Sequence, residues 1–468
     1  MLIRFNVKNF LSFSARVDPV SGQLASQEFS MIPGKVRNKM EHIYENHKQS
    51  LLKFAAVYGA NASGKSNLVK ALDFMQKTIV TGKVPSNSTE KYSKLESENK
   101  NLPTYFSLEI LLDNHSYEYG FELILQTGQF VSEWLYEISK ESQKCLFEKK
   151  ENGKKYVFEN ELRSISNLEM YAQDIIGSNI LLLSLMNQNK EGFYVKNPNA
   201  LILKDIFRWF QNSIDIIYPN RPISDFSYLT EIGNMPEVSR LISAFGTGIS
   251  EINSIEIPIE KMLAVLPTFI KKEVSEQIEA ITKVINISNE NNSPRKIQKW
   301  AGLIRSPNQL FTLEIDDNAK PTVREIKFTH QNNSYTFDLS EESDGTVRLF
   351  DLLEMLVSNK EKTYIIDELD RCMHPCLTYK FIETFLEYAK ERKVQLIVTS
   401  HESRLLDFEL LRRDEIWFVD KNIKGESTLY SLEEYNERFD KKVDKAYLEG
   451  RYGGVPLFTT MFPIEKGK

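Results

Sequence analysis

Several stretches in the first third of the chain alternate apolar with polar residues, as strands with one buried face do. In the opening stretch, Ile3, Phe5 and Val7 are expected on one face of a strand. Two longer alternating runs, 106–112 and 117–123, stand on either side of a short polar turn and predict a β-hairpin.

Helical spacing of apolar residues dominates from about residue 160 to residue 310. The longest runs with this spacing are 201–217 and 259–285. Residues 284–296 are rich in Asn, Ser, Glu and Lys and are expected to form a flexible connection. Strand patterns return at 310–315, so the helical segment is expected to be an insertion between two parts of one domain.

Composition and charge narrow the class of protein. The chain has 468 residues with 41% hydrophobic and 26% charged content, enough for a sizeable core. A net charge of −6 argues against a basic field over the whole molecule, while a local patch for nucleic acid stays open. Three cysteines argue against a disulfide framework. Without an apolar run of about 18 residues, we expect a soluble, cytoplasmic protein without a membrane span.

Residues 57–68, VYGANASGKSNL, match the phosphate-binding pattern G-x-x-x-x-G-K-[ST] completely. A buried strand is expected at 53–59 and a helix at 67–79, which is the context that this pattern requires. Such a loop binds the phosphates of ATP or GTP through its backbone N–H groups and the N-terminus of the helix.

The residue types in the loop suggest their roles. Lys65 is expected to neutralise phosphate charge, and the Ser66 hydroxyl to ligate Mg²⁺. The residues expected to bind the nucleotide are Gly59, Ala60, Asn61, Ala62, Ser63, Gly64, Lys65, Ser66 and Asn67.

A second buried strand, at 363–366, ends in two carboxylates. Ligands bind at the carboxyl ends of strands in parallel sheets, so Asp367 is expected to hold Mg²⁺. Glu368 is expected to orient and deprotonate the attacking water as the catalytic base. A third buried strand, 394–399, ends at Ser400-His401.

The segment LSEESDGTVRLFDLLEML predicts a helix that begins after Ser343. Gly345 permits close backbone approach at the start of this helix. The helix is expected to bury an apolar face made of Leu349, Leu352, Leu353 and Leu356.

Together these elements resemble ABC-type ATPases. In that family a Ser-x-Gly element at a helix start binds the γ-phosphate of the other subunit's ATP, which implies this role for Ser343 and Gly345. Here S-D-G-T stands where L-S-G-G-[QE] is common. His401 resembles the switch histidine of that family, a further catalytic residue. The order of loop, signature, Asp-Glu and His is the ABC order, whereas an AAA+ arrangement lacks the helix-start signature.

A large insertion between the phosphate loop and the signature resembles heads of the SMC and Rad50 kind. KNFLSF (8–13) is similar to their N-F-x-S-F opening, with Leu11 where many carry Arg. The resemblance implies an α/β fold, an ABC-type P-loop NTPase head with a mixed sheet and an antiparallel lobe, interrupted by a mainly helical insertion. The expected limits are 1–160 for the N-terminal half of the head, 161–310 for the insertion and 311–468 for the C-terminal half.

The run IIDELDRCMHPCLTYKF, with 412–435 and 446–458, resembles AAA-family ATPases of bacterial phage-defence loci. These are of the AbiL and RloA type and are similar to the ATPase of the PARIS system. The resemblance implies ATP and Mg²⁺ as cofactors and a homodimer or higher homo-oligomer. It also implies a separately encoded toxic effector, such as a Toprim-like nuclease, and a phage protein as trigger. The expected function is a sensor or scaffold in abortive infection.

Two other functions remain alternatives. A RecF- or Rad50-like ATPase of DNA repair or chromosome maintenance would share the same head, and a fused nuclease of the OLD type would carry a further Toprim domain. A zinc site at Cys372, His374 and Cys376 is not expected, because ligands so closely spaced cannot easily close a four-ligand site. Gln126 and Gln129 both remain candidates for the glutamine that contacts Mg²⁺ in ABC heads.

Overall fold

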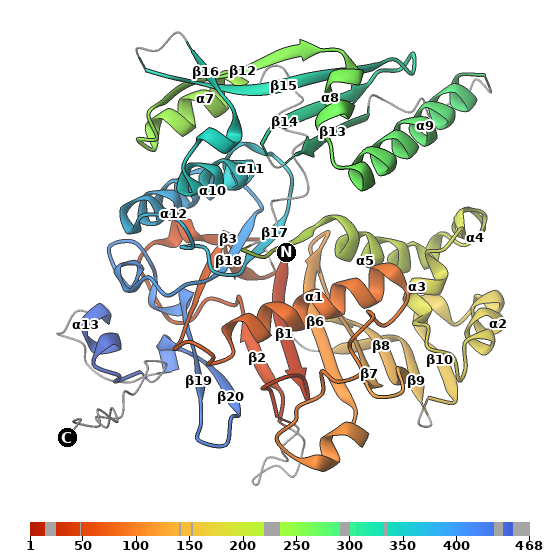
Figure 1. The fold of residues 1–468 in the computed structure, drawn as a ribbon. Helices are drawn as coiled ribbons and strands as arrows, with labels where there is room; N and C mark the ends of the chain where they lie inside the picture. The colour runs from red at the N-terminus through yellow and green to blue at the C-terminus, as the bar shows by residue number, and fades with distance from the viewer. Residues whose placement is uncertain are drawn as a thin grey trace, which may run out of the picture. The chain divides into compact units, whose positions relative to one another are not determined.

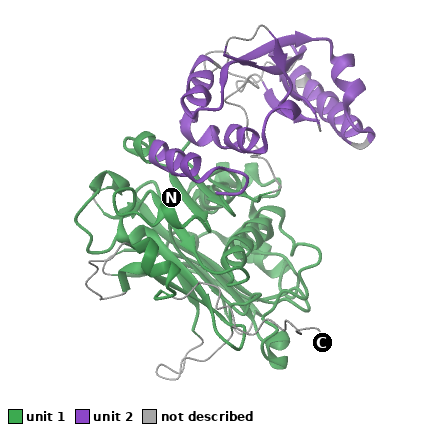
Figure 2. Cartoon of the chain, turned by 60° about the vertical axis from the view of Figure 1, so that its left-hand side comes forward, with its two compact units in different colours: residues 1–219, 360–369, 386–468 green, residues 220–359, 370–385 purple. Residues whose placement is uncertain are grey.

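The computed structural model of the chain describes residues 1–14, 25–46, 48–139, 142–150, 153–219, 235–290, 300–306, 308–331, 335–434 and 443–452. The chain forms two compact units, which Figure 2 colours separately. Unit 1 comprises Met1–Pro219, Lys360–Leu369 and Leu386–Lys468, and unit 2 comprises Asn220–Asn359 and Asp370–Phe385.

Unit 1 contains an antiparallel sheet of seven strands in the order β10-β9-β8-β7-β6-β1-β2. Its strands are β1 (Leu2–Lys8), β2 (Gln27–Ser30), β6 (Thr104–Leu112), β7 (His115–Ile124), β8 (Gln129–Ile138), β9 (Gln143–Lys150) and β10 (Lys155–Phe158). The predicted hairpin is β6–β7. Both turn residues, Asp113 and Asn114, have positive φ (46° and 65°), as a type I′ turn requires.

The face of β1 differs from the prediction. Phe5 and Val7 lie in the main core with Leu2, whereas Ile3 joins a small separate cluster with Met1, Leu51 and Leu111. The pairing of β1 with β6 shifts register between Leu2 and Arg4, so Ile3 is an extra residue in the ladder. Such a bulge reverses the side on which the preceding side chains point.

The second sheet of unit 1 has six strands in the order β11-β17-β18-β5-β19-β20. They are β5 (Phe54–Tyr58), β11 (Ile214–Ile217), β17 (Thr363–Ile366), β18 (Gln395–Thr399), β19 (Ile416–Lys421) and β20 (Ser427–Ser431). All pair in parallel except β20, which is antiparallel to β19 at the edge. The expected mixed α/β fold is therefore confirmed, with β5 buried between two parallel neighbours.

The helices of unit 1 are α1 (Lys65–Thr81), α2 (Ser166–Asp174), α3 (Leu182–Met186), α4 (Glu191–Lys196), α5 (Leu201–Asn212) and α13 (Val443–Leu448). Helices α1 to α5 pack with both sheets into one core, whereas α13 lies outside that core. In Figure 1, α1 crosses in front of β1 and β6, and the ring of Phe74 on α1 stacks on Phe106 of β6 at 5.1 Å. A two-stranded ribbon, β3 (Ile43–Glu45) with β4 (Ser50–Leu52), precedes β5.

A buried glutamine joins the N-terminal strand to the parallel sheet. Gln395, at the start of β18, accepts a hydrogen bond from the backbone N–H of Leu2 (2.6 Å). Its amide donates to the carbonyl oxygens of Leu2 (2.9 Å) and Leu52 (3.1 Å). Because buried polar groups need partners, this amide fixes the start of the chain against the strand that leads to β5.

Unit 2 is built on an antiparallel sheet in the order β12-β15-β14-β13, with β16 paired to β15. Its strands are β12 (Ile249–Ile257), β13 (Trp300–Arg305), β14 (Leu310–Ile315), β15 (Pro321–His330) and β16 (Thr336–Phe337). Its helices are α7 (Met235–Ala244), α8 (Ile259–Val265), α9 (Thr268–Glu290), α10 (Asp344–Leu352) and α11 (Glu354–Val357). Helix α12 (Pro375–Ala389) starts in unit 2 and ends in unit 1.

The segment predicted as a mainly helical insertion therefore contains strands. The run 201–217 was expected to be one helix, but its last residues form β11, which pairs in parallel with β17. Residues 249–257 and 300–305 form strands of unit 2. Short apolar runs rich in isoleucine fit a buried strand as well as a helix, and pairing with a neighbouring strand decides between the two.

The compact units also have other limits than the predicted 1–160, 161–310 and 311–468. Residues 161–219 belong to unit 1, and unit 2 extends beyond residue 310 to residue 359. The division into head and insertion at 160 and 310 stays a prediction. Residues 291–296 of the predicted connection, and Tyr435 and residues 453–458 of the segments that carry the family resemblance, lie outside the described residues.

Residues 83–103, which are rich in Ser, Glu, Lys and Asn, are packed against the start of the chain. The amide of Asn9 donates to the carbonyl oxygens of Asn99 and Leu102 (2.9 Å each). The backbone N–H of Ser93 donates to Asn9 Oδ1 (3.1 Å), and Ser93 is fully buried. The buried side chain of Asn9 thus holds this polar segment in place.

Candidate functional site

The predicted phosphate loop connects β5 to α1. Every residue of β5 is buried, and α1 begins at Lys65 with Gly64 as its N-cap. Within the loop, the backbone N–H of Ser63 donates to the carbonyl of Ala60 (3.1 Å), and Ala62 has a φ of 64°. Strand, loop and helix follow one another as the motif requires, and the N-terminus of a helix favours an anion.

Neighbouring atoms lie so close to both glycines of the motif that neither position has room for a side chain. A Cβ at Gly59 would lie 2.3 Å from the carbonyl oxygen of Val419 on β19. A Cβ at Gly64 would lie 2.4 Å from the hydroxyl of Ser427 on β20, and the φ of Gly64 is +121°, which side chains rarely adopt. The strands next to the loop therefore determine its shape.

Two serines far from the motif are bonded to the loop. Ser12 Oγ accepts a hydrogen bond from the Asn67 amide (2.7 Å) and lies 2.7 Å from Ser427 Oγ. The backbone N–H of Ser427 donates to the Ser12 carbonyl (2.9 Å), and its hydroxyl also reaches the carbonyl of Ser63. Ser12 belongs to the KNFLSF opening, whereas nothing in the sequence marked Ser427.

Leu11, in the KNFLSF opening, is part of the packing. It is half-buried against the core of unit 1, and its backbone N–H donates to the carbonyl of Lys91 (2.7 Å). It offers no charge to a phosphate.

Lys65 and His401 are brought together although they come from different strand ends. Lys65 is 5% exposed, and its ammonium donates to the carbonyls of Gly59 (2.7 Å) and Ala60 (3.1 Å). His401 follows β18, is exposed, and places Nδ1 3.5 Å from Lys65 Nζ. The two side chains thus lie at one edge of the parallel sheet, beside the phosphate loop.

The two predicted magnesium ligands are in direct contact. The Ser66 hydroxyl donates to Asp367 Oδ1 at 3.0 Å, and Asp367 is 4% exposed at the end of β17. Thr399, at the end of β18, donates to the same oxygen at 2.7 Å. The neighbouring parallel strands thus place a carboxylate against the first turn of α1.

The groups beside Asp367 are of the kind that binds Mg²⁺. A carboxylate and a hydroxyl are hard oxygen donors, and Mg²⁺ is usually held by one or two protein groups together with substrate phosphates and water. Ser66 and Asp367 provide such a pair beside the phosphate loop. The residues therefore fit Mg²⁺, and Ser66 and Asp367 are the groups that would hold it.

Glu368 occupies an unusual backbone conformation. Its φ is 52°, in the left-handed region that costs a side chain of this size of order 1–3 kcal/mol. Its backbone N–H donates to Thr399 Oγ1 at 2.8 Å, and the N–H of Leu369 donates to the Thr399 carbonyl at 3.0 Å. The turn after β17 is therefore held to the end of β18, and it presents a half-buried Glu368 carboxylate.

Ser343 and Gly345 lie in unit 2, at the start of α10. Ser343 is the N-cap and accepts a hydrogen bond from the Thr346 N–H (3.2 Å), and the predicted leucine face is buried. A Cβ at Gly345 would lie 2.8 Å from the Cys372 carbonyl. A hollow of about 670 Å³ opens here, lined by residues 244–247, 343–346, Cys372, His374, Cys376, Leu377 and Lys380.

A C-terminal helix contributes a further contact that the sequence did not indicate. Tyr447 on α13 stacks on Phe418 of β19 (5.7 Å between centroids) and meets the edge of Tyr58, the last residue of β5 (5.9 Å). Burial raises the pKa of the Tyr447 hydroxyl, and a hydrogen bond with the backbone of Gly59 opposes this shift. Helix α13 therefore supports the start of the phosphate loop.

The other candidate residues lie elsewhere. Gln126, in the β7–β8 turn, and Gln129, the first residue of β8, are exposed. No hydrogen bond within the described ranges connects them with the phosphate loop. Cys372 and Cys376 are free and exposed thiols. In the described part of the chain, no three His, Cys, Asp or Glu side chains are grouped as ligands of one metal ion.

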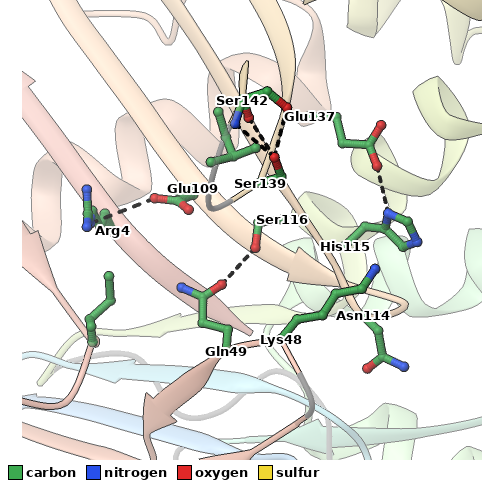
Figure 3. A pocket seen from close by; sticks show the side chains of 12 residues that line it. Arg4, Lys48, Gln49, Glu109, Asn114, His115, Ser116, Glu137, Ser139 and Ser142 are labelled. Carbon is green, nitrogen blue, oxygen red and sulfur yellow. Dashed lines mark hydrogen bonds and ion pairs between the residues drawn. The ribbon is translucent and has the colours of Figure 1, made fainter. Parts of the chain in front are cut away.

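Another cavity, of about 680 Å³, lies in unit 1 and is lined by Arg4, residues of the β6–β7 turn and the end of β8. Figure 3 shows the His115 ring turned toward Glu137 (2.6 Å) and Ser116 toward Gln49 (2.8 Å). Most polar side chains of this cavity are hydrogen-bonded or ion-paired to one another, and none of the predicted site residues lines it. The phosphate loop is therefore the candidate catalytic site of unit 1.

No helix among the described residues has the length and apolar character needed to cross a bilayer.

Comparison with solved structures finds SMC heads. "Crystal structure of the SmcHead bound to the C-winged helix domain of ScpA" is 17% identical, over 93% of this chain and 99% of that chain, with a TM-score of 0.40. "SMC head domain from Thermotoga maritima" is 13% identical, over 92% and 98%, with a TM-score of 0.33. A head with an extended coiled coil, bound to the C-terminal domain of ScpA derived from Pyrococcus furiosus, is 16% identical, over 92% and 97%, with a TM-score of 0.37.

No curated protein gives a significant match to the sequence. The sequence does match the family described as "AAA domain, putative AbiEii toxin, Type IV TA system", over residues 54–161 and 249–407. The matched residues make up more than half of the chain and include the phosphate loop, Asp367-Glu368 and His401. The chain therefore belongs to this family of AAA domains.

Proposed function

We propose that the chain binds and hydrolyses ATP with Mg²⁺. One observation carries this proposal: the Ser66 hydroxyl lies 3.0 Å from Asp367 Oδ1, directly after a complete phosphate-loop motif. A hydroxyl and a carboxylate placed together beside a Gly-rich loop form the usual protein contribution to a Mg²⁺–nucleotide site. Membership in a family of AAA domains supports the same reaction.

Each side chain at the loop has a distinct part in this proposal. Lys65 binds the β- and γ-phosphates, and Glu368 orients the attacking water and accepts its proton. His401, 3.5 Å from Lys65, contacts the γ-phosphate. When bound, Mg²⁺ neutralises phosphate charge as it develops during transfer.

We propose further that the active form is a homodimer or a higher homo-oligomer. Ser343 and Gly345 begin a helix of nine residues whose first turn faces a hollow of about 670 Å³. An open helix N-terminus of this kind accepts an anion. In the proposed assembly, this anion is the terminal phosphate of a nucleotide held by another copy.

The biological setting that we propose is anti-phage defence by abortive infection. The description of the family names an AbiEii toxin and a type IV toxin–antitoxin system, which supports this setting. Here the chain is the sensor or scaffold. It controls a separately encoded toxic effector, such as a Toprim-like nuclease, and responds to a phage protein.

A pull-down with the Glu368→Gln variant in Mg-ATP tests the setting, with native mass and identification of partners as readouts. We expect a multimer that carries a toxic protein. A bare dimer that retains DNA would instead favour a RecF- or Rad50-like repair ATPase. The Lys65→Ala variant is the control, because its complexes should not depend on ATP.

A further inference from the structure

Thr399, the last residue of β18, connects the two carboxylates of the candidate site. It is 2% exposed. Its hydroxyl donates to Asp367 Oδ1 at 2.7 Å and accepts from the backbone N–H of Glu368 at 2.8 Å. No sequence pattern singled it out, since a threonine at the end of a buried strand is ordinary.

The single proton of the hydroxyl fixes the direction of these hydrogen bonds. A backbone N–H can only donate, so Thr399 Oγ1 must accept from Glu368 and give its own proton to Asp367. Asp367 Oδ1 also accepts from Ser66 at 3.0 Å. Two hydroxyl donors therefore converge on one carboxylate oxygen and set the rotation of the carboxyl group.

The same hydroxyl supports the strained turn at Glu368. A φ of 52° at a glutamate needs compensation from its surroundings, and the N–H of this residue bonds to Thr399 rather than to another backbone group. The N–H of Leu369 bonds to the Thr399 carbonyl at 3.0 Å. Thr399 thus holds both the metal-binding carboxylate and the backbone of the catalytic base.

We propose that Thr399 is a positioning residue that sets the affinity of the site for Mg²⁺ in the presence of ATP. This inference rests on the proposed ATPase function. Groups that orient a metal-binding carboxylate without touching the metal typically contribute 10–100-fold to metal affinity or activity. We assign Thr399 a positioning role, because its hydroxyl donates to Asp367 and accepts from Glu368.

A matched pair of variants separates the effect of losing the hydroxyl from the effect of changing the packing. Thr399→Ser and Thr399→Ala both lose the buried methyl group, and they differ only in the hydroxyl. Mg²⁺ is titrated into protein with ATP, and Mn²⁺ binding followed by electron paramagnetic resonance gives a second readout that needs no turnover. ATP binding without metal and the unfolding midpoint are measured beside them.

We expect Thr399→Ala to weaken the apparent Mg²⁺ affinity by about 10–100-fold relative to Thr399→Ser. ATP binding without metal should stay within about twofold in both variants, because Lys65 and the loop are unchanged. Should Thr399→Ala be too unstable to purify, Thr399→Cys takes its place, because a thiol is a weak hydrogen-bond donor.

Equal Mg²⁺ affinities in Thr399→Ser and its hydroxyl-free counterpart would overturn the inference. Failure of the proposed function would look different. In that case the wild-type protein would not bind Mg-ATP at all, and Lys65→Ala would match it.

Discussion

The hydroxyl of Ser66 and the carboxylate of Asp367 are hydrogen-bonded at 3.0 Å, although 301 positions separate them in the sequence. Ser66 lies in the first turn after β5, and Asp367 directly follows β17. These strands run in parallel with β18 between them, so their carboxyl ends meet at one edge of the sheet. The sheet order, rather than proximity in sequence, therefore creates the candidate site.

Replacing Lys65 with Ala should remove most of the affinity for ATP. The ammonium lies inside the loop, and hydrogen bonds to charged groups contribute about 1.5–3 kcal/mol each. We therefore expect at least a roughly 10- to 100-fold weaker affinity, measured by calorimetry.

Lys70→Ala is the matched control for this variant. Lys70 lies on the same helix α1 and is exposed, so its removal should leave ATP affinity unchanged. Equal losses in both variants would mean that general charge, and not the loop, binds the nucleotide.

Replacing Glu368 with Gln should abolish turnover while preserving binding. A positioned general base contributes about 10²–10⁴-fold to rate, and Gln keeps the size of the side chain without its basicity. We expect ATP hydrolysis to fall by this factor, with ATP affinity close to that of the wild type. The variant should accumulate as an ATP-bound oligomer in native mass measurements.

Glu361→Gln tests whether this effect is specific. Glu361 is exposed before β17 and pairs with Lys393 at 2.9 Å, away from the strand's carboxyl end. Its variant should hydrolyse ATP at the wild-type rate. Wild-type turnover in Glu368→Gln would refute the role assigned to that carboxylate.

The parts of the site that the sequence predicted are those that are contiguous along the chain. The phosphate loop, the strand before Asp367 and the helix after Ser343 each carry their own local pattern. Positions 59 and 64 are glycine because neighbouring atoms leave no room for a Cβ there. Both glycines are part of the motif, so the sequence alone indicates this close packing.

The parts that escaped prediction depend on contacts between distant segments. Thr399 and Ser427 act through hydrogen bonds to residues that are remote in sequence, and their types are common in strands. The edge strand β11 looked helical, because periodicity in a short apolar run does not settle its structure. The bulge at Ile3 likewise depends on the pairing with β6.

If the proposed assembly forms, replacing Gly345 with Ala should affect the step in which a second copy takes part. The new methyl group would lie 2.8 Å from the Cys372 carbonyl, a backbone atom that cannot easily move. Overpacking of this kind costs about 1–3 kcal/mol, so the free energy of unfolding measured in urea should fall by that amount. ATP-dependent oligomerisation should weaken, while ATP binding by the loop in unit 1 should remain.

Gly192→Ala provides the comparison for this substitution. A Cβ at Gly192, on helix α4, would meet no atom within 4 Å, so its unfolding free energy should not fall. If Gly345→Ala assembled like the wild type, the α10 start would have no part in oligomerisation.

The three cysteines should react at different rates with a thiol reagent. Burial raises the pKa of the Cys145 thiol to about 11, with Glu159 and Glu148 adding to the shift, so at pH 8 only about 0.1% is the reactive thiolate. Cys372 and Cys376 are exposed. With a chromogenic disulfide, we expect Cys372 and Cys376 to react in a fast phase and Cys145 in a slow phase. The Cys145→Ser variant should lack the slow phase. Three equal rates would contradict this assignment.

Replacing Ser427 with Ala should weaken nucleotide binding from outside the motif. Its hydroxyl reaches Ser12 Oγ and the carbonyl of Ser63, and both contacts are buried. A hydrogen bond of this kind contributes about 0.5–1.5 kcal/mol, so we expect up to a roughly tenfold loss of ATP affinity. Thr428→Ala, the next residue on β20 and exposed, should have no effect.

A double-mutant cycle decides whether Ser427 acts through Ser12. If the two serines form one unit that shapes the loop, combining Ser12→Ala with Ser427→Ala should cost less ATP-binding free energy than the sum of the single changes. Additive losses would mean that each serine acts alone. No loss in either single variant would mean that the glycines and β19 hold the loop without them, since the backbone bond from Ser427 to Ser12 persists in every variant.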